Sequence, residues 1–251
     1  MEQSIETMVN RITSILSKNC PSIFLFGSVV IDDFKLGWSD IDFICLTDNM
    51  IRQNQADELV ALRQTLMAEH PGNPYFRLFE GAMLTLDAFL QGIDDTVVYW
   101  GTSGQRLTNR HRLCAFSTME LLENGRILCG NDFRHLIAHP TRAEIIEAIK
   151  QHYGTIRQHG NSGGGWLLDI ARCLYTLQTG KIISKTKAGE WVIEQNLCPD
   201  IATMKKIVEI RKNPYELKDS EEVIEWQKTL RPHIQRFADV LEAKLANNNQ
   251  I

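Results

Sequence analysis

The sequence predicts an α/β amino-terminal half, with helices on a small mixed sheet, followed by an all-helical bundle. Short apolar runs alternate with helical patterns up to residue 139, and no convincing strand pattern follows Thr141. A chain of 251 residues, 43% of them hydrophobic, can bury the cores of one large or two modest domains. We therefore expect two domains, residues 1–139 and 140–251, divided near the sequence AHPT.

The elements of the first half follow from periodicity and from their end signals. Helical spacing of apolar residues predicts an amphipathic helix over about residues 1–18, and LCAFSTMELLEN predicts another that ends before Gly125. A third helix is expected from about Ile51 to Glu69, before the turn sequence HPGNP. The expected strands are SIFLF, DIDFICL, YFRLFEGAMLTL, TVVYW and RILCG.

The second half reads as helices throughout. Each expected helix shows apolar residues at helical spacing between turn or cap signals. The expected helices are TRAEIIEAIKQHY, GWLLDIARCLYTLQTG, KAGEWVIEQN, DIATMKKIVEIRKN and one long helix, SEEVIEWQKTLRPHIQRFADVLEAKL.

The composition indicates which kinds of molecule the protein binds. The net charge of -4 lacks the basic field of a protein that coats long nucleic acid, so phosphate chemistry would need local charge. The six cysteines form no C-x-x-C pair, and no apolar run approaches the ~20 residues of a membrane span. We expect a cytoplasmic monomer or weak dimer that acts on small molecules, without a membrane or long nucleic acid as partner.

Asp40 and Asp42 open the second expected strand, where acids are poorly suited to a core. Residues two apart in a strand point to the same side, so the two carboxylates project together. Like charges held side by side repel, and a cation between them removes the repulsion. Because Mg²⁺ is commonly bound by one or two carboxylates together with substrate phosphates, the pair indicates a metal-nucleotide site.

Gly27 and Ser28 follow the first expected strand. A glycine there lets the backbone approach a phosphate closely, and the next residues offer N–H groups and a hydroxyl to its oxygens. The alternative is that Gly27 only makes a turn and Asp40 only caps one, which are common roles for these residue types. The order of strand, Gly-Ser, spacer and Asp-x-Asp strand favours a site for a triphosphate.

The stretch FGSVVIDDFKLGWSDIDFICL, residues 26–46, resembles the signature of the nucleotidyltransferase superfamily shared with DNA polymerase beta. That signature has an apolar residue, Gly, Ser, a spacer and Asp-x-Asp within a strand. The resemblance implies nucleotidyl transfer with Mg²⁺, in two ions, and with ATP as co-substrate. It does not identify the acceptor.

A second stretch, LLDIARCLYTLQTGKIISKTKAGEWVIEQN, resembles the helical carboxyl-terminal domain of the streptomycin and spectinomycin adenylyltransferases. This resemblance implies that Arg172 and Lys185 contact the nucleotide phosphates. Residues 181–212 hold seven basic residues against four acids, which agrees with a phosphate contact. The alternative for most of these lysines is a solvated helix face.

The family also implies a third carboxylate, on a later strand, that acts as general base. Glu80 lies in the apolar run RLFEGAML, where a carboxylate is costly unless it is paired or functional. Apolar surroundings would also raise its pKa toward a range useful for accepting a proton. Asp87 is the alternative base, and we rank it second because it follows LTL near a turn.

The drug-binding residues are the least determined by the sequence. The resemblance implies acids and a tryptophan that bind a polycationic aminoglycoside, but the corresponding loop HGNSGGG contains no acid. The remaining candidates for the acceptor site are Trp100, Asp169 and Glu190.

The predicted reaction is transfer of AMP from ATP to a hydroxyl of a small molecule of the aminoglycoside type. Asp40 and Asp42 would hold Mg²⁺, and Glu80 would accept the hydroxyl proton. Two alternatives stay open at this point: an antitoxin-type enzyme that adenylylates a protein, and a catalytically silent nucleotide sensor. The presence of all three carboxylates argues against the silent protein.

Overall fold

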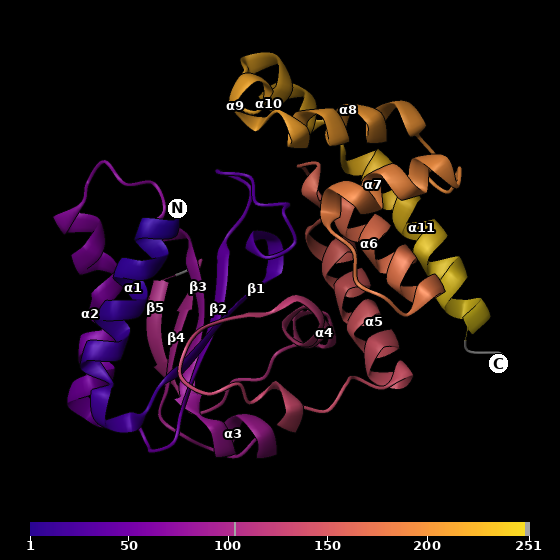
Figure 1. Ribbon diagram of the computed structural model, residues 1–251. Helices are drawn as coiled ribbons and strands as arrows, with labels where there is room; N and C mark the ends of the chain where they lie inside the picture. The colour runs from indigo at the N-terminus through magenta and orange to yellow at the C-terminus, as the bar shows by residue number, and fades with distance from the viewer. Residues whose placement is uncertain (103, 249–251) are drawn as a thin grey trace. The chain divides into compact units, whose positions relative to one another are not determined.

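The computed structural model describes residues 1–102 and 104–248 (Figure 1). The chain divides into two compact units: residues 1–32 with 39–139, and residues 33–38 with 140–251. The sequence-based boundary after residue 139 had placed 33–38 in the first domain. These residues instead pack with the second unit, where the buried Asp33 carboxylate forms an ion pair with Arg211 at 3.0 Å.

The first unit is built on a mixed sheet with the strand order β5-β4-β3-β2-β1-β6. Strands β2 and β3 are parallel, and the other neighbouring pairs are antiparallel. The strands are β1 (Ser22–Phe26), β2 (Ile41–Thr47), β3 (Phe79–Thr85), β4 (Val97–Gly101), β5 (Gly104–Thr108) and β6 (Arg126–Cys129). The predicted mixed sheet is confirmed, with β5 as a strand that the sequence did not predict.

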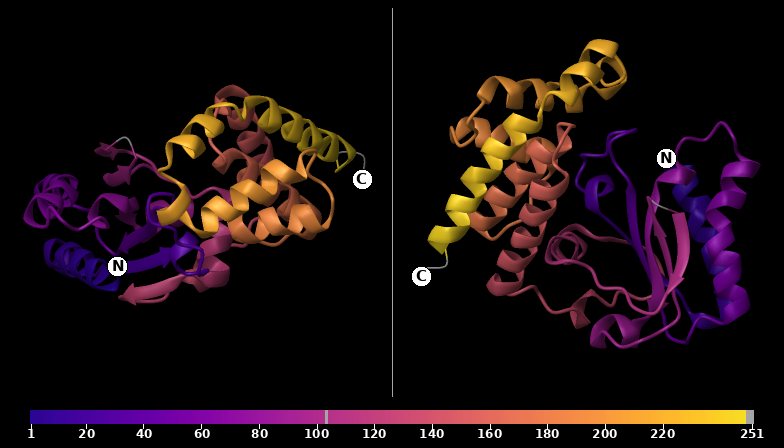
Figure 2. Two further views of the ribbon diagram at one scale, coloured as in Figure 1. Left: turned by 90° about the horizontal axis from the view of Figure 1, so that it is seen from above. Right: turned by 180° about the vertical axis from the view of Figure 1, so that it is seen from behind.

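Helices pack on both faces of this sheet (Figure 2). On one face, the indole N–H of Trp100 donates a hydrogen bond to the carbonyl of Leu59 in α2, 3.0 Å away. On the other face, Ala88 of α3 and Leu121 of α4 join a core cluster with Ile44 of β2. The helices of this unit are α1 (Glu2–Ile15), α2 (Gln53–Glu69), α3 (Leu86–Gln91) and α4 (Ala115–Asn124).

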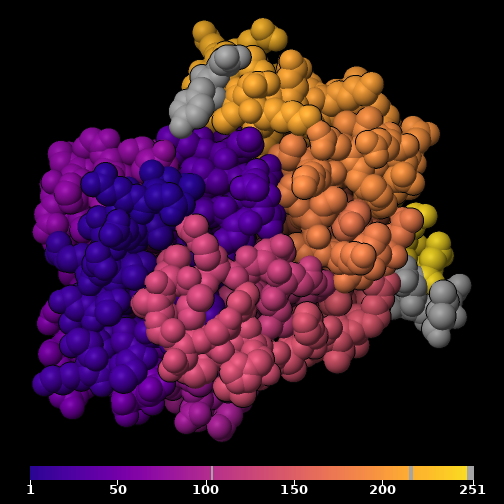
Figure 3. Space-filling view, in the orientation of Figure 1, coloured from indigo at the N-terminus to yellow at the C-terminus, as the bar shows by residue number. Residues whose placement is uncertain are grey.

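In helix α1 the apolar residues at helical spacing form the buried side. Ile5, Met8 and Ile12 of α1 are buried, and the residues between them are partly or fully exposed. Figure 3 shows the outer side of this helix, in dark indigo, at the surface of the first unit. The amphipathic helix predicted for this segment is therefore confirmed, and it ends at Ile15.

Every regular element in the described part of the second unit is a helix, as predicted. Helix α6 packs against α5, α7 and α11. The helices are α5 (Arg142–His159), α6 (Gly165–Thr179), α7 (Lys185–Glu194), α8 (Ile201–Lys212), α9 (Pro214–Leu217), α10 (Glu221–Lys228) and α11 (Arg231–Asn248). The single long helix expected over 220–245 is thus two, and Pro232 lies in the first turn of α11, where its missing N–H costs no helical hydrogen bond.

No helix among the described residues is both long and apolar enough to cross a membrane. This finding covers residues 1–102 and 104–248 and agrees with the absence of a long apolar run in the sequence.

Candidate active site

The end of β1 and the beginnings of β2 and β3 meet at one edge of the sheet. In the antiparallel register Phe26 pairs with Asp42, and in the parallel register Asp42 pairs with Glu80. Helix α2 lies between β2 and β3 in the chain, so Asp42 and Glu80 are far apart in sequence although they are neighbours in the sheet. Strand pairing therefore places Asp42 and Glu80 directly beside each other.

Asp42 and Glu80 project from the same side of the sheet, and Asp40 lies nearby, two residues before Asp42 in the chain. Asp42 shares its side of β2 with Ile44, and Glu80 shares its side of β3 with Ala82, because side chains alternate along a strand. Ile44 and Ala82 belong to one buried cluster. Asp40, immediately before β2, is likewise partly exposed, and its charge acts on the Glu80 carboxyl. Asp42 and Glu80 therefore lie on the sheet face that also carries this buried cluster, two residues before Ile44 and Ala82 along each strand.

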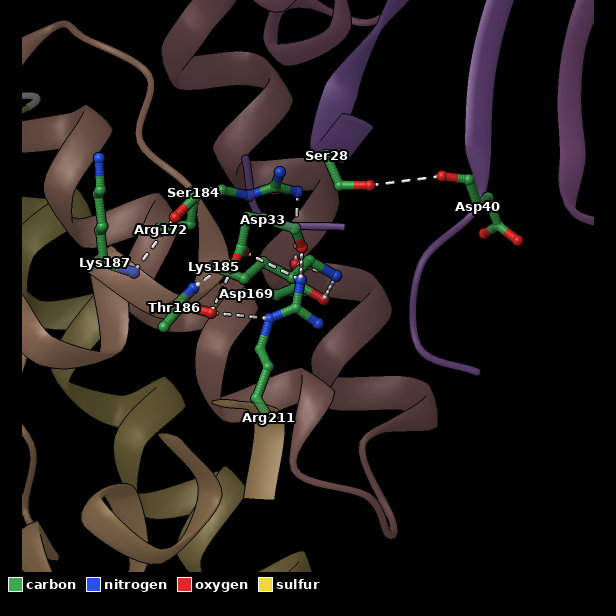
Figure 4. A network of polar contacts seen from close by, with 10 residues as sticks. All are labelled: Ser28, Asp33, Asp40, Asp169, Arg172, Ser184, Lys185, Thr186, Lys187 and Arg211. Atoms are coloured by element: carbon green, nitrogen blue, oxygen red, sulfur yellow. Dashed lines mark hydrogen bonds and ion pairs between the residues drawn. The ribbon is translucent and has the colours of Figure 1, made fainter. Parts of the chain in front are cut away.

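The Gly27-Ser28 turn packs closely against the acidic edge, which consists of Asp40, Asp42 and Glu80 at these strand ends. Gly27 has a φ of +70°, in the left-handed region that favours glycine, and a Cβ at this position would lie 2.3 Å from Oδ2 of Asp42. The Ser28 hydroxyl donates a hydrogen bond to the backbone carbonyl of Asp40, 3.4 Å away (Figure 4). Only glycine leaves room for the Asp42 carboxylate beside the turn.

Glu80 has the electrostatic character of a base. Burial raises the pKa of its carboxyl above the ordinary value, and the charge of Asp40 raises it further. A hydrogen bond from Tyr99 and the nearby Arg63 guanidinium act in the opposite direction. The net shift is upward, which makes the carboxylate a better proton acceptor than a fully hydrated one.

Arg63 is a residue of this region that the sequence analysis did not identify. Its guanidinium is buried and donates to the carbonyl of Phe79 at 2.7 Å and to the carbonyl of Gly101 at 2.8 Å. These bonds fix the start of β3, next to Glu80, to the end of β4. The signal was an arginine between Leu62 and Leu66 on the apolar side of α2, where a charge needs partners.

Asp87, the alternative base, lies elsewhere. It is exposed in the first turn of α3, beyond the end of β3 that is opposite to Glu80. A rise of about 3.3 Å per strand residue puts these two acids well apart, so Asp87 is not part of the acidic edge. The geometry favours Glu80 as the base.

The placement of Trp100 corrects its assignment as a drug contact. Trp100 is 0% exposed and lies under α2, with its indole N–H bonded to Leu59. Its ring meets Phe43 edge to face, with 5.4 Å between the ring centroids. It is a core residue on the face opposite to the carboxylates, because the adjacent Tyr99 takes the other side of the strand.

The donor set fits Mg²⁺ only together with substrate oxygens. Among residues 1–102 and 104–248, no group of three or more His, Cys, Asp or Glu side chains is arranged to hold a metal ion. Asp42 at the start of β2 and Asp40 immediately before it supply two hard, partly exposed carboxylates, and Gly27 leaves room for the Asp42 side chain. Two carboxylates with phosphate oxygens form a common Mg²⁺ ligand set, so the residues present fit a metal-nucleotide complex.

In the second unit, three of the predicted residues lie together (Figure 4). Asp169 pairs with the Lys185 ammonium at 3.0 Å and with the Arg172 guanidinium at 3.4 Å. Burial acts to raise the pKa of Asp169, but the two cations outweigh it and lower the pKa. The structure therefore groups the two candidate phosphate ligands around Asp169, which balances part of their charge.

Glu190 does not belong to this group. It forms an ion pair with Lys212 of α8 and lines a hollow of about 430 Å³ between α7 and α8. The other lining residues include Ile193 and Val208, so the floor of this hollow is partly apolar.

The N-terminus of α7, which carries Lys185, is held by a buried network that the sequence did not reveal. The Asp33 carboxylate accepts hydrogen bonds from the Thr186 hydroxyl at 2.5 Å and from the Thr186 N–H at 3.3 Å. Arg211 of α8 donates to the same carboxylate at 3.0 Å (Figure 4). The centroid of the Trp38 ring lies 5.9 Å from the Arg211 guanidinium. A spacer residue of the nucleotidyltransferase signature thus caps a helix of the second unit.

Two family models match the chain, in separate regions. Residues 10–70 match the nucleotidyltransferase domain, and residues 136–241 match the C-terminal domain of aminoglycoside adenylyltransferases. The two resemblances noted in the sequence are confirmed by these matches. A search of curated proteins found no match to the chain.

Among solved structures, the chain is similar to a spectinomycin adenyltransferase from Enterococcus that was crystallised with ATP and spectinomycin. The TM-score is 0.64, and the match covers 96% of this chain and 99% of that chain at 17% sequence identity. This likeness shows a shared fold along nearly the whole chain and confirms the predicted sheet unit followed by a helical unit.

Proposed function

We propose that the chain is a nucleotidyltransferase that transfers AMP from ATP to a hydroxyl of a small aminoglycoside-type molecule, as its matches to the nucleotidyltransferase domain and to the C-terminal domain of aminoglycoside adenylyltransferases support. The observation that carries this proposal is the pairing of Asp42 with Glu80 on parallel strands, with the charge of Asp40 close enough to act on Glu80. One arrangement then offers both a site for a metal-nucleotide complex and a base beside it.

In this proposal Asp40 and Asp42 hold Mg²⁺, in two ions when ATP is bound. Bound Mg²⁺ neutralises phosphate charge and so makes the α-phosphorus easier to attack. Gly27 and Ser28 line the triphosphate, because the backbone at Gly27 can approach it without a side chain in between. Bound Mg²⁺ would reduce the repulsion between the two carboxylates.

The chemical step requires a proton acceptor and a good position for the attacking hydroxyl. The hydroxyl oxygen forms a bond to the α-phosphorus as the bond from this phosphorus to the bridging oxygen of the β-phosphate breaks. The hydroxyl proton goes to Glu80, and pyrophosphate leaves with the bridging oxygen. The raised pKa of Glu80 suits this role, because an ordinary carboxylate is a weaker base.

The residues of the second unit take the binding roles. Arg172 and Lys185 bind phosphate oxygens, and Asp169 sets their orientation through the two ion pairs. Asp169 and Glu190 are also the acids that we propose for ammonium groups of the acceptor. Each already has a cationic partner, so an acceptor ammonium would share or replace a lysine contact.

The test is a transfer assay with labelled ATP. The protein is incubated with Mg²⁺, ATP labelled at the α-phosphate and a panel of aminoglycosides, aminocyclitols and lincosamides. We expect label on at least one acceptor and release of pyrophosphate. Asp42→Asn should abolish transfer, whereas Asp48→Asn should not, because Asp48 is exposed just beyond the opposite end of β2.

The possible outcomes separate the candidate functions. Label on a protein and on none of the small molecules would replace this proposal with protein adenylylation. Binding of ATP with no transfer to any acceptor would indicate a nucleotide sensor. Transfer that survives Asp42→Asn would remove the metal role of the acidic edge.

A further inference from the structure

Tyr99 lies on the same side of the sheet as the acidic edge, although no sequence pattern marked it. Its Cα pairs with Ala82 across β3 and β4, which makes Glu80 a diagonal neighbour. The phenol O–H donates a hydrogen bond to Oε1 of Glu80, 3.0 Å away. Burial and the Glu80 carboxylate raise the pKa of the phenol, so it stays protonated and remains a donor.

The Tyr99 ring is itself held in place from two directions. The Arg106 guanidinium on β5 lies over the ring, 4.5 Å from its centroid, and Arg106 is the register partner of Tyr99. The His111 ring lies 5.6 Å away on a tilted plane, and burial lowers the pKa of this histidine. The other charged groups that act on Glu80 and Tyr99 are the guanidinium of Arg63 and the carboxylates of Asp40 and Asp42. The phenol is therefore a fixed donor.

We propose that Tyr99 is the positioning residue of the general base: it holds Oε1 of Glu80 so that Oε2 faces the acceptor hydroxyl. The proposal rests on the assignment of Glu80 as base in the proposed function. A glutamate at a strand start can adopt several rotamers, and only one of them presents an oxygen to a given attacking atom. A hydrogen bond to one oxygen selects that rotamer before the substrate binds.

Asp42 on β2 and Tyr99 on β4 lie on opposite sides of Glu80. Repulsion from the Asp42 charge and the hydrogen bond to Tyr99 therefore both direct the Glu80 carboxylate toward β4, where a partner can fix its orientation. Tyr99 supplies this partner without a net positive charge. A lysine or arginine in its place would hold the carboxylate too, but would also lower its basicity.

The experiment is a double-mutant cycle with Tyr99→Phe and Glu80→Gln. Tyr99→Phe removes only the phenol oxygen and keeps the ring that packs against Arg106. Tyr153→Phe is the matched control, because it removes a phenol that bonds to Arg157 in the second unit. Each variant is measured for kcat, for KM of ATP and acceptor, and for melting temperature. A crystal structure of Tyr99→Phe shows the orientation of the Glu80 carboxylate.

We expect Tyr99→Phe to lower kcat roughly 10-fold, the usual effect of losing a hydrogen bond to a charged group, with unchanged KM for ATP. In the Glu80→Gln background the same change should have no further effect. The crystal structure should show Glu80 in more than one orientation, and Tyr153→Phe should leave kcat unchanged.

Three results would overturn the inference: an unchanged kcat in Tyr99→Phe, an equal loss of kcat in the Glu80→Gln background, or a single unaltered Glu80 conformer in Tyr99→Phe. A lower melting temperature with normal kcat would assign Tyr99 a structural role only. If the unsubstituted protein adenylylates no acceptor, the proposed function fails. The crystal structure of Tyr99→Phe still decides whether Tyr99 orients Glu80.

Discussion

Asp42 and Glu80 are register partners on the parallel strands β2 and β3, although all of α2 lies between them in the sequence. Neighbouring strands are about 4.8 Å apart, so two acids are held side by side at the edge of a sheet. A bound cation would reduce the repulsion between these two carboxylates, and a substrate hydroxyl could give its proton to Glu80.

Asp42→Asn is expected to abolish turnover and to weaken binding of Mg-ATP. The substitution keeps the size of the side chain but removes a negative charge from the proposed metal site. Loss of one such electrostatic contact costs on the order of 10²- to 10³-fold in kcat. Turnover, calorimetric ATP binding and melting temperature check the prediction, with Asp48→Asn as control. Normal turnover in Asp42→Asn would exclude it as a metal ligand.

Lys185→Ala is expected to raise KM for ATP more than KM for the acceptor. The Lys185 ammonium lies beside Arg172 around Asp169, and we assign it to phosphate oxygens. Lys187→Ala is the matched control, because Lys187 is exposed on the same helix two residues later. Steady-state kinetics with each substrate varied in turn give the answer. A rise in KM for the acceptor alone would mean that Lys185 binds the acceptor and not the nucleotide.

Asp33→Ala is expected to lower the free energy of unfolding by about 3 to 5 kcal/mol, because it leaves the charge of Arg211 buried without its partner. The side chains of Asp33 and Arg211 are 7% and 3% exposed. Glu225→Ala breaks the exposed ion pair with Lys228 and should cost less than about 1 kcal/mol. Denaturant unfolding compares the two variants. Equal losses in the free energy of unfolding would mean that the buried Asp33–Arg211 pair stabilises the fold no more than an exposed ion pair does.

The stabilising effect of Asp169 should depend on pH. Its folded-state pKa is lowered below the ordinary 3.8, so its contribution is fully present above that value and is lost as the pH falls through the folded-state pKa. Asp169→Asn should therefore be less stable than the unsubstituted protein at about pH 7, by roughly 1 to 3 kcal/mol. The difference should shrink in acid below 3.8. A difference that is constant with pH would show that the ion pairs do not stabilise the fold.

The sequence predicted the motif-bearing strands because strong local signals mark them. Gly27 directly follows β1, and Asp40 and Asp42 lie immediately before and at the second residue of β2. The same reasoning missed β5, because GQRLT has one large apolar residue, Leu107, and that residue is exposed on an edge strand. Local patterns reveal an element only where burial imposes a period on it.

The assignments that failed depend on contacts between distant residues. Trp100 was chosen and Tyr99 overlooked, although adjacent strand residues face opposite sides and only one of them can face the carboxylates. The sequence alone does not determine which of Tyr99 and Trp100 faces the carboxylates, because this depends on the pairing of β3 with β4. The role of Asp33 also follows from its contacts with Thr186 and Arg211, and nothing in a loop sequence indicates such partners.

The most direct test of a catalytic carboxylate at this edge is the Glu80→Gln variant, measured for kcat, ATP affinity and melting temperature together. Glutamine keeps the size and hydrogen-bonding reach of Glu80 but cannot take a proton. We predict that kcat falls by roughly 10²- to 10⁴-fold, the usual worth of a general base, while ATP affinity and melting temperature are retained. Glu58→Gln, an exposed residue of α2, should behave like the unsubstituted protein. Normal turnover in Glu80→Gln, or joint loss of ATP binding and stability, would contradict the account.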